Sequence, residues 1–326
     1  MDFNLDETQQ ELKKLAAEVL AGEEAEERLR QTGLMDVCLP EEAGGAGLGP
    51  VELAVVLREV GARAAMVPAL PTLAATLLLA RQAGPDRRGR RPGRLTLAVR
   101  EPGRALADPP TTSATRPDGG DGWVLTGRKV SVPHPAPEVL VTADAGLFLV
   151  TSPDAAPEHT STGEPAATIV LDGTPAERVA GPEAVPDARR VLMAAVTAQA
   201  SGVLAGALEL TTSYIRQRRQ FGRALAEFQA VTMQIADVYI AARALDVAMW
   251  SGAWRLGEGL PADEDLALAA YHVGEALKAL YTCQHLHGGL GLDVTYPLHR
   301  YFAQARHLSH LLGGADAQLD LIGALV

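Results

Sequence analysis

Two short stretches carry residue types that could hold a phosphate-bearing ligand. The first is the polar cluster RQRRQFG at residues 216–222, where Arg218 offers a planar set of donors that can bind two oxygens of a pyrophosphate. Within and just after this cluster, Gln220 and Gln229 can donate hydrogen bonds to ligand oxygens, and Phe221 can pack against a ring system. A solvated charge at a helix end is the alternative interpretation of Arg218.

The second stretch is the glycine-rich loop GGLG at residues 288–291. Its three glycines, Gly288, Gly289 and Gly291, would let the backbone approach a ligand closely, or would simply form a turn with positive φ. His285 and Gln284 lie just before the loop.

Metal chemistry is not predicted. Five histidines lie close together late in the chain, but no cysteine or acidic cluster with metal-ligand spacing joins them: His285, His287, His299, His307 and His310. The two cysteines, Cys38 and Cys283, are far apart and have neither redox nor metal spacing, so a reduced, cytoplasmic protein is expected. The chain begins with acidic residues rather than the basic and apolar regions of a signal peptide.

A long apolar helix from Asp187 must position the polar cluster, because the helix runs directly into it. No residue from Val191 to Leu208 is charged, which is long enough to raise the question of a membrane span. The segment consists mainly of Ala, Gly, Ser and Thr, so it is too weakly hydrophobic for a span, and its small residues would let other helices approach. We therefore expect the central helix of a bundle and no membrane span.

The remaining chain divides into helices, then strands, then helices. Helices are expected from a capping box at Asn4 and Glu7 to about Glu27, from Pro50 to about Ala65, and from Pro71 to Ala83. A basic Pro/Gly linker follows at residues 85–94. Short apolar runs separated by turn residues then indicate an antiparallel β-domain: residues 95–99, 123–126, 139–142, 147–151 and 168–171.

The predicted fold class is mainly α with a central β-domain, an α+β arrangement. Its domains are a helical domain with linker at residues 1–94, a β-domain at 95–186, and a C-terminal four-helix bundle at 187–326. A net charge of −11 argues against nucleic acid as a partner, because binding phosphate backbones needs a basic surface.

Several motifs in order give the chain its resemblance to the acyl-CoA dehydrogenase family of flavoproteins. They are RRQFG at 218–222, FQA at 228–230, AD at 236–237, HGGLG at 287–291 and YPLHRY at 296–301, with weaker matches at LPEE (39–42) and EPG (101–103). Their spacing across the helix, strand, helix order extends the resemblance over nearly the whole length.

This resemblance implies an oligomer in which each FAD lies between two subunits. One subunit supplies the β-domain and a glutamate that removes the α-proton of an acyl-CoA thioester, while the β-hydrogen leaves as hydride to the flavin. The other subunit lends contacts to that FAD. In this chain the lending residues implied by the resemblance are Arg218, Gln220, Phe221, Gln229, His285, Gly288, Gly289 and Gly291. An electron-transferring flavoprotein is the acceptor that the family implies.

The catalytic glutamate of the family has no counterpart here. Its usual position, before a glycine pair, is occupied by Leu312, and the alternative position in the central helix is occupied by Leu192. Leucine cannot accept a proton. In the strand after Lys129, the residues that would back the flavin are replaced by Ser131 and Pro133, and proline offers neither hydroxyl nor N–H.

What a subunit gives to its own flavin is therefore missing, whereas most of what it gives to its neighbour's flavin is retained. The exception is the position before the glycine loop, where His285 stands in place of the family's usual glutamine. This pattern predicts the non-catalytic partner in a heteromeric acyl-CoA dehydrogenase, an α2β2 heterotetramer resembling the paired actinobacterial subunits that act on bulky steroid-CoA thioesters. Two alternatives stay open. One is a homo-oligomeric enzyme whose base has moved, with Glu209, Asp293 and Asp316 as candidates. The other is a flavin-free subunit that binds acyl-CoA or protein.

Overall fold

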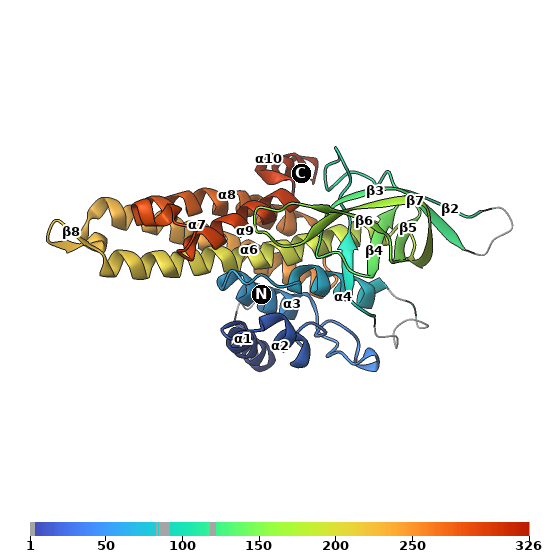
Figure 1. Ribbon diagram of the computed structural model, residues 1–326, viewed down its shortest axis with the longest axis horizontal. Helices are drawn as coiled ribbons and strands as arrows, with labels where there is room; N and C mark the ends of the chain where they lie inside the picture. The colour runs from blue at the N-terminus through green and yellow to red at the C-terminus, as the bar shows by residue number, and fades with distance from the viewer. Residues whose placement is uncertain (1–3, 83, 85–91, 118–121, 326) are drawn as a thin grey trace. The chain divides into compact units, whose positions relative to one another are not determined.

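The computed structural model describes residues 4–82, 84, 92–117 and 122–325. Helices precede and follow a β-domain, as expected (Figure 1). The predicted basic linker at residues 85–94 lies largely outside the described residues. The chain forms two compact units: Met1–Glu23, Ala54–Met66 and Val196–Val326 in one, and Glu24–Leu53 with Val67–Ala195 in the other.

The described helices begin with α1 (Glu7–Leu20) and α2 (Ala25–Gln31), where the sequence predicted a single helix to about Glu27. Glu24 interrupts it with a φ of 56°, a left-handed conformation that an α-helix does not accommodate. The capping box is formed by Asp6 and Gln9 rather than by Asn4 and Glu7. The next helices are α3 (Pro50–Ala62) and α4 (Ala69–Gln82), close to their predicted bounds.

The β-domain is built on one seven-stranded sheet in the order β1-β4-β5-β7-β3-β2, with β6 paired to β7. The strands are β1 (Leu95–Ala98), β2 (Ser113–Thr115), β3 (Trp123–Pro133), β4 (Glu138–Ala143), β5 (Gly146–Thr151), β6 (Asp154–Glu158) and β7 (Ala166–Ala180). All described pairings are antiparallel except β1 with β4, which is parallel. An apolar cluster that includes Leu125, Val141, Phe148 and Ile169 forms its core, and α4 packs against β1.

The central helix α6 (Ala184–Gln217) begins three residues before the predicted start. At that end the Asp187 carboxylate accepts hydrogen bonds from Arg81 Nε at 2.9 Å and from Gln82 Nε2 at 2.7 Å. Of its most apolar 18-residue window, 89% is buried inside the protein. Among the described helices it is the one long and apolar enough to cross a membrane, and this burial identifies it as a core helix.

Glycines let α3 and α6 cross with their backbones in contact. A Cβ on Gly202 would lie 1.9 Å from the carbonyl oxygen of Arg58, and one on Gly61 would lie 2.0 Å from that of Gln199. These distances are far below van der Waals contact, so no larger residue fits without moving a helix. The predicted close approach of helices to the small residues of α6 is confirmed.

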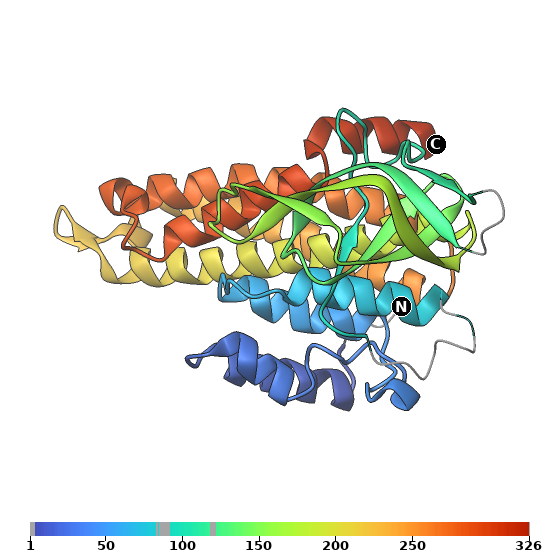
Figure 2. The same ribbon diagram turned by 45° about the vertical axis from the view of Figure 1, so that its right-hand side comes forward.

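After α6 the chain forms the small hairpin β8 (Arg219–Gln220) and β9 (Arg223–Ala224), then α7 (Gln229–Gly257) and α8 (Asp263–His287). The 3-10 helix η3 (Gly288–Leu292) leads into α9 (Leu298–Leu311) and α10 (Gly314–Leu325). Figures 1 and 2 show α6 and α7 running alongside α8 and α9, with the β8–β9 hairpin projecting from one end of this bundle.

Candidate functional site

The β8–β9 hairpin presents most of the predicted ligand-binding cluster to solvent. Arg218, Gln220 and Phe221 are all exposed, and Phe221 is 91% exposed with a φ of 53°. Its ring lies edge-on to Phe228, with centroids 6.3 Å apart, at the start of α7. A large aromatic side chain held outward by a left-handed backbone gains nothing from burial within this chain.

The hairpin is anchored at its base by backbone hydrogen bonds through Arg218. Its N–H donates to Tyr214 O at 2.8 Å, and its carbonyl accepts from Leu225 N at 2.9 Å. The guanidinium is left at the surface. The backbone is thus fixed while the side-chain donors remain available to a ligand.

The glycine-rich loop forms η3, and its three glycines have different constraints. Gly291 is required by packing, because a Cβ there would lie 2.6 Å from Gln284 O, and Gly288 is required by its φ of 60°. Gly289 has ordinary φ and open space around its Cβ position. The fold of this chain therefore gives no reason for a glycine at 289.

His287, which is buried, connects the loop to the end of α6 through a network that sequence reasoning did not assign. Its ring stacks on Tyr214, with centroids 4.3 Å apart at 20°, and its Nδ1 lies 2.8 Å from Cys283 O. A carbonyl can only accept, so Nδ1 carries the proton and Nε2 accepts from the Tyr296 hydroxyl at 3.2 Å. Burial lowers the pKa of His287, which favours this neutral form.

This network brings together three motifs that are separate in sequence. Tyr214 lies one turn before Arg218, His287 immediately precedes Gly288, and Tyr296 begins the Tyr-Pro turn before α9. Both polar stretches singled out from the sequence therefore lie at one end of the same helical unit. In the sequence, the one feature that could have indicated a role for His287 is its position directly before two glycines.

The predicted residues outside the hairpin are also at the surface, with one exception. Gln229, His285, Gly288 and Gly289 are exposed, and Gly291 is buried. Gln284 Nε2 donates to Gly291 O at 3.4 Å, so this glutamine holds the loop while the neighbouring His285 faces solvent. Among the described residues no group of three or more His, Cys, Asp or Glu could hold a metal ion.

Comparisons of sequence families and of individual proteins match this chain to the same family. The sequence models of the acyl-CoA dehydrogenase N-terminal and C-terminal domains match residues 5–87 and 190–326. The chain is 39% identical to acyl-CoA dehydrogenase FadE28 of Mycobacterium tuberculosis, covering 99% of this chain and 98% of that protein. The chain belongs to the acyl-CoA dehydrogenase family.

Solved structures of this family include two close matches that are complexes of two proteins. The Tcur3481-Tcur3483 steroid ACAD, as a G363A variant, gives a TM-score of 0.90 at 37% identity, covering 98% of this chain and 97% of that one. The ChsE4-ChsE5 complex from Mycobacterium tuberculosis gives a TM-score of 0.89 at 30% identity, covering 99% and 98%. Butyryl-CoA dehydrogenase of Megasphaera elsdenii, 22% identical, matches in fold with a TM-score of 0.87 over 100% and 99% of the two chains.

The two leucines predicted to stand at the family's base positions are both buried. Leu312 caps the C-terminal end of α9 and is 1% exposed, and Leu192 lies within α6 and is 7% exposed. Of the other carboxylates considered, Glu209 lines a cavity of about 640 Å³ with Arg58 and Tyr239. Asp293 is a poor base, because hydrogen bonds from Thr295 lower its pKa.

The strand β3, which the resemblance predicts to be the flavin-backing strand, is distorted near Ser131. A register shift lies between Lys129 and Val132, and Ser131 has a φ of 53°. The Ser131 N–H donates to Glu158 Oε1 at 3.0 Å, and the same oxygen accepts from Thr168 Oγ1 at 2.6 Å. The backbone N–H of Ser131 is therefore already hydrogen-bonded to a carboxylate of this chain, that of Glu158.

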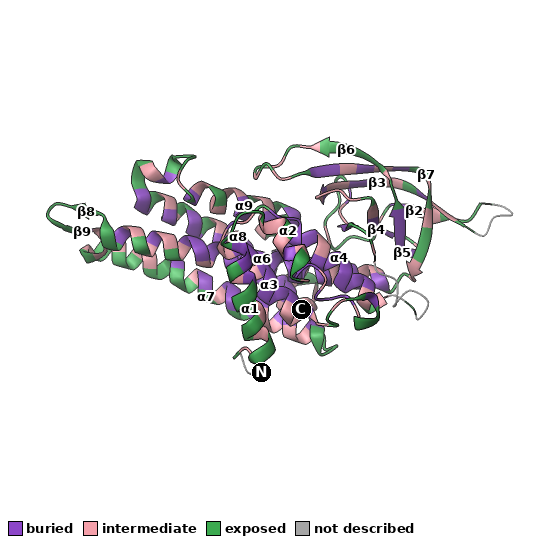
Figure 3. Ribbon diagram, turned by 60° about the horizontal axis from the view of Figure 1, so that its bottom comes forward, coloured by how far each residue is buried: buried purple, intermediate pink, exposed green. Residues whose placement is uncertain are grey.

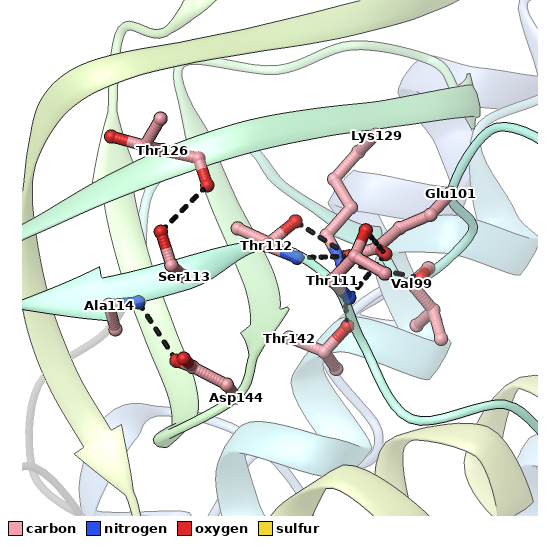
Figure 4. A network of polar contacts seen from close by, with 10 residues as sticks. All are labelled: Val99, Glu101, Thr111, Thr112, Ser113, Ala114, Thr126, Lys129, Thr142 and Asp144. Carbon is pink, nitrogen blue, oxygen red and sulfur yellow. Dashed lines mark hydrogen bonds and ion pairs between the residues drawn. The ribbon is translucent and has the colours of Figure 1, made fainter.

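A buried ion pair fixes the segment after β1 (Figure 4). Lys129 Nζ lies 2.6 Å from Glu101 Oε1, with side-chain exposures of 0% and 3%, and also donates to Thr142 Oγ1 at 3.1 Å. The backbone N–H and hydroxyl groups of Thr111 and Thr112 donate to the same carboxylate. Burial alone would raise the pKa of Glu101, but the bonds from Lys129 and the threonines lower it to about 2.

Proposed function

We propose that this chain is the non-catalytic subunit of a heteromeric, FAD-dependent acyl-CoA dehydrogenase that introduces an α,β double bond into an acyl-CoA thioester. The observation that carries the proposal is the burial of two leucines, Leu192 and Leu312, at the positions where the resemblance predicts the family's base. The catalytic glutamate then comes from a second, homologous subunit. Similarity to two-protein complexes, one of them a steroid ACAD, supports this arrangement.

The residues lent to the partner's FAD are those of the hairpin and the glycine loop. The set comprises Arg218, Gln220, Phe221, Gln229, His285, Gly288, Gly289 and Gly291. The residues suit this role: the Arg218 donors are exposed above a fixed backbone, and Gly289 keeps open a space that a Cβ would fill. FAD, when bound, accepts the hydride that leaves the substrate's β-carbon.

One FAD for each pair of unlike chains is part of the same proposal. The Ser131 N–H already donates to Glu158, and Pro133 has no N–H to donate, so the strand that would back a flavin offers neither donor. These features favour a β-domain that holds no flavin of its own. The Arg100 carbonyl accepts from Val130 N at 3.0 Å, so the segment before Glu101 is tied to the same distorted strand.

The wider assembly follows from the same assignment. The partner is a catalytic acyl-CoA dehydrogenase subunit in an α2β2 heterotetramer, and the substrate is an acyl-CoA with a bulky, steroid-type acyl group. An electron-transferring flavoprotein receives the electrons, and the complex is cytoplasmic. The domain bounds at residues 94 and 186 remain predictions.

Arg218→Ala tests the lending role in the co-expressed complex. Removing a charge-assisted contact to pyrophosphate is expected to cost about 1.5–3 kcal/mol, an FAD affinity about 10- to 150-fold weaker. Flavin titration of the stripped complex gives the dissociation constant. The matched control is Arg219→Ala, which removes the same charge from the next residue of the hairpin and should stay within about twofold of wild type. Equal affinities for wild type and Arg218→Ala would disprove the role.

A further inference from the structure

A cavity beside the β-domain is lined by three arginines that the proposed function does not use. Its volume is about 280 Å³, and it is lined by Arg100 and Arg104 from the segment after β1 and by Arg189 from the second turn of α6. Thr142 of β4 forms part of the wall, and β4 is buried from Val139 to Ala143 (Figure 3). The described lining residues all lie within one compact unit of the chain.

Arg100 brings an unsatisfied hydrogen-bond donor to this cavity. Its Nη1 atom is buried and has no hydrogen-bond partner among the described residues. Burial lowers the pKa of Arg100, although the negative charge of Glu158 opposes this change. The Glu158 carboxylate accepts from Ser131 and Thr168, and no described hydrogen bond joins it to Arg100. A buried charged donor without an acceptor is unfavourable, and an oxyanion in the cavity is the kind of acceptor that would satisfy this guanidinium.

The charges that line the cavity leave an excess of positive charge. Among the described lining residues, three carboxylates face the three guanidiniums. One of them, Glu101, is already neutralised by Lys129, whose Nζ lies 2.6 Å away (Figure 4). Asp108 lies 3.4 Å from Arg104 and offsets part of its charge, and Asp144 is exposed to solvent. The cavity therefore favours an anion over a cation.

The size and the remaining walls of the cavity indicate what kind of anion fits. Its volume is just below the roughly 300–1,000 Å³ usual for sites of drug-sized ligands, so a small molecule matches it rather than a dinucleotide. Leu106, Val185 and four prolines supply apolar wall. Arginine side chains bind phosphate and carboxylate groups through paired N–H donors. The lining thus combines an anion-binding part with an apolar part.

We propose that this cavity binds a small organic anion, whose phosphate or carboxylate group is held by Arg100, Arg104 and Arg189 while a short apolar body packs against Leu106 and Val185. The Arg100 carbonyl accepts from Val130 N, so this arginine is tied to the strand that the proposed function leaves without a flavin. The anion site goes beyond the proposed function and does not depend on it, because it is formed by the cavity of this chain alone.

Titration of the co-expressed complex tests the site with three probes: inorganic phosphate, butyl phosphate and butyrate, all at constant ionic strength. Binding is followed by calorimetry and by the rise in melting temperature. Arg100→Gln removes a charge-assisted contact and should weaken binding about 10- to 150-fold. Arg100→Lys keeps the charge but loses the planar fork, so its affinity should lie between. Butyl phosphate should bind at least about threefold more tightly than inorganic phosphate, because its butyl group leaves water.

The matched control is Arg128→Gln. Arg128 is an exposed arginine of β3 that is absent from the described lining of the cavity, and the change removes the same charge. Its affinity for each probe should stay within about twofold of wild type. Without any probe, Arg100→Gln should melt at or above the wild-type temperature, because it removes a buried charge that lacks an acceptor.

The order of the probes identifies the ligand class. Tighter binding of butyl phosphate than of butyrate assigns a phosphate, and the reverse order assigns a carboxylate. No binding of any probe by either method, or equal losses in Arg100→Gln and Arg128→Gln, would overturn the site. A lower melting temperature for Arg100→Gln with unchanged affinity would overturn it too, since Arg100 would then be structural.

The flavin content separates this inference from the proposed function. Arg100→Gln should leave FAD per pair of chains unchanged, and loss of flavin together with probe binding would overturn the anion site by placing the flavin in this cavity. A yellow homo-oligomer whose probe binding still depends on Arg100 would refute the proposed function while leaving the anion site standing.

Discussion

The buried ion pair of Lys129 and Glu101 gives the sharpest prediction of stability. Among the described residues, Lys129 is the only cation that forms an ion pair with Glu101, and Lys129→Met removes it. The Glu101 side chain is only 3% exposed. Breaking a buried pair from one side costs about 3–5 kcal/mol in unfolding free energy. Thr111 and Thr112 still donate to the carboxylate, so we expect the lower end of this range, about 3 kcal/mol.

The assay is urea unfolding followed by tryptophan fluorescence at fixed protein concentration. Trp123 lies on β3, the strand that carries Lys129, and packs edge-on against Phe148. The double variant Lys129→Met/Glu101→Gln should be more stable than Lys129→Met alone, because no unpaired charge remains buried.

The matched control for charge removal is Arg30→Ala. Arg30 pairs with Glu26 across one turn of α2, and both side chains are about a third or more exposed, so the loss should stay below about 1 kcal/mol. A Lys129→Met loss no larger than that of Arg30→Ala would refute the reasoning. A double variant less stable than the single would refute the role given to the unpaired charge.

Two further predictions concern pH and the glycine loop. The pKa of Glu101 is about 2 in the folded chain against its usual 4.5, so the unfolded chain binds this proton more readily as pH falls. The ionised Glu101 should contribute about 3 kcal/mol to the unfolding free energy above about pH 5, and this contribution should be lost towards pH 2. In urea unfolding, Glu101→Gln should lose less stability than wild type as the pH falls. Equal dependence of the two proteins on pH would contradict the assignment. His287→Phe keeps a ring stacked on Tyr214 but loses both side-chain hydrogen bonds, so the FAD affinity of the complex should fall about 5- to 30-fold. Tyr296→Phe loses one of these bonds, so its FAD affinity should lie between those of wild type and His287→Phe. Unchanged affinity with a lowered melting temperature would limit His287 to a structural role.

Much of the fold could be predicted from local pattern. The apolar runs of β1, β4 and β5 and the small residues of α6 carry their own signal, because periodicity and composition are local properties. β2 (Ser113–Thr115) and β6 (Asp154–Glu158) were missed, since short polar strands have no apolar run and exist only through pairing with β3 and β7. The parallel pairing of β1 with β4 was missed for another reason: both strands were predicted, but the direction in which two strands pair is set by the fold and leaves no local pattern.

The candidate site also contains residues that the sequence could predict and contacts that it could not. Arg218 and the glycines could be predicted as site residues because their motifs are contiguous and resemble a known family. The His287 network was not found, since its partners Tyr214 and Tyr296 are 73 and 9 residues away and meet only in the fold. The Lys129–Glu101 pair spans 28 residues, and a buried lysine leaves no pattern in sequence.

The most direct test of the central claim is FAD per chain and native mass, first for this chain alone and then for the chain co-expressed with a catalytic acyl-CoA dehydrogenase subunit. The account predicts a colourless or unstable chain alone, and a complex with about one FAD for each pair of unlike chains. A yellow homo-oligomer with one FAD per chain and activity on an acyl-CoA would contradict it.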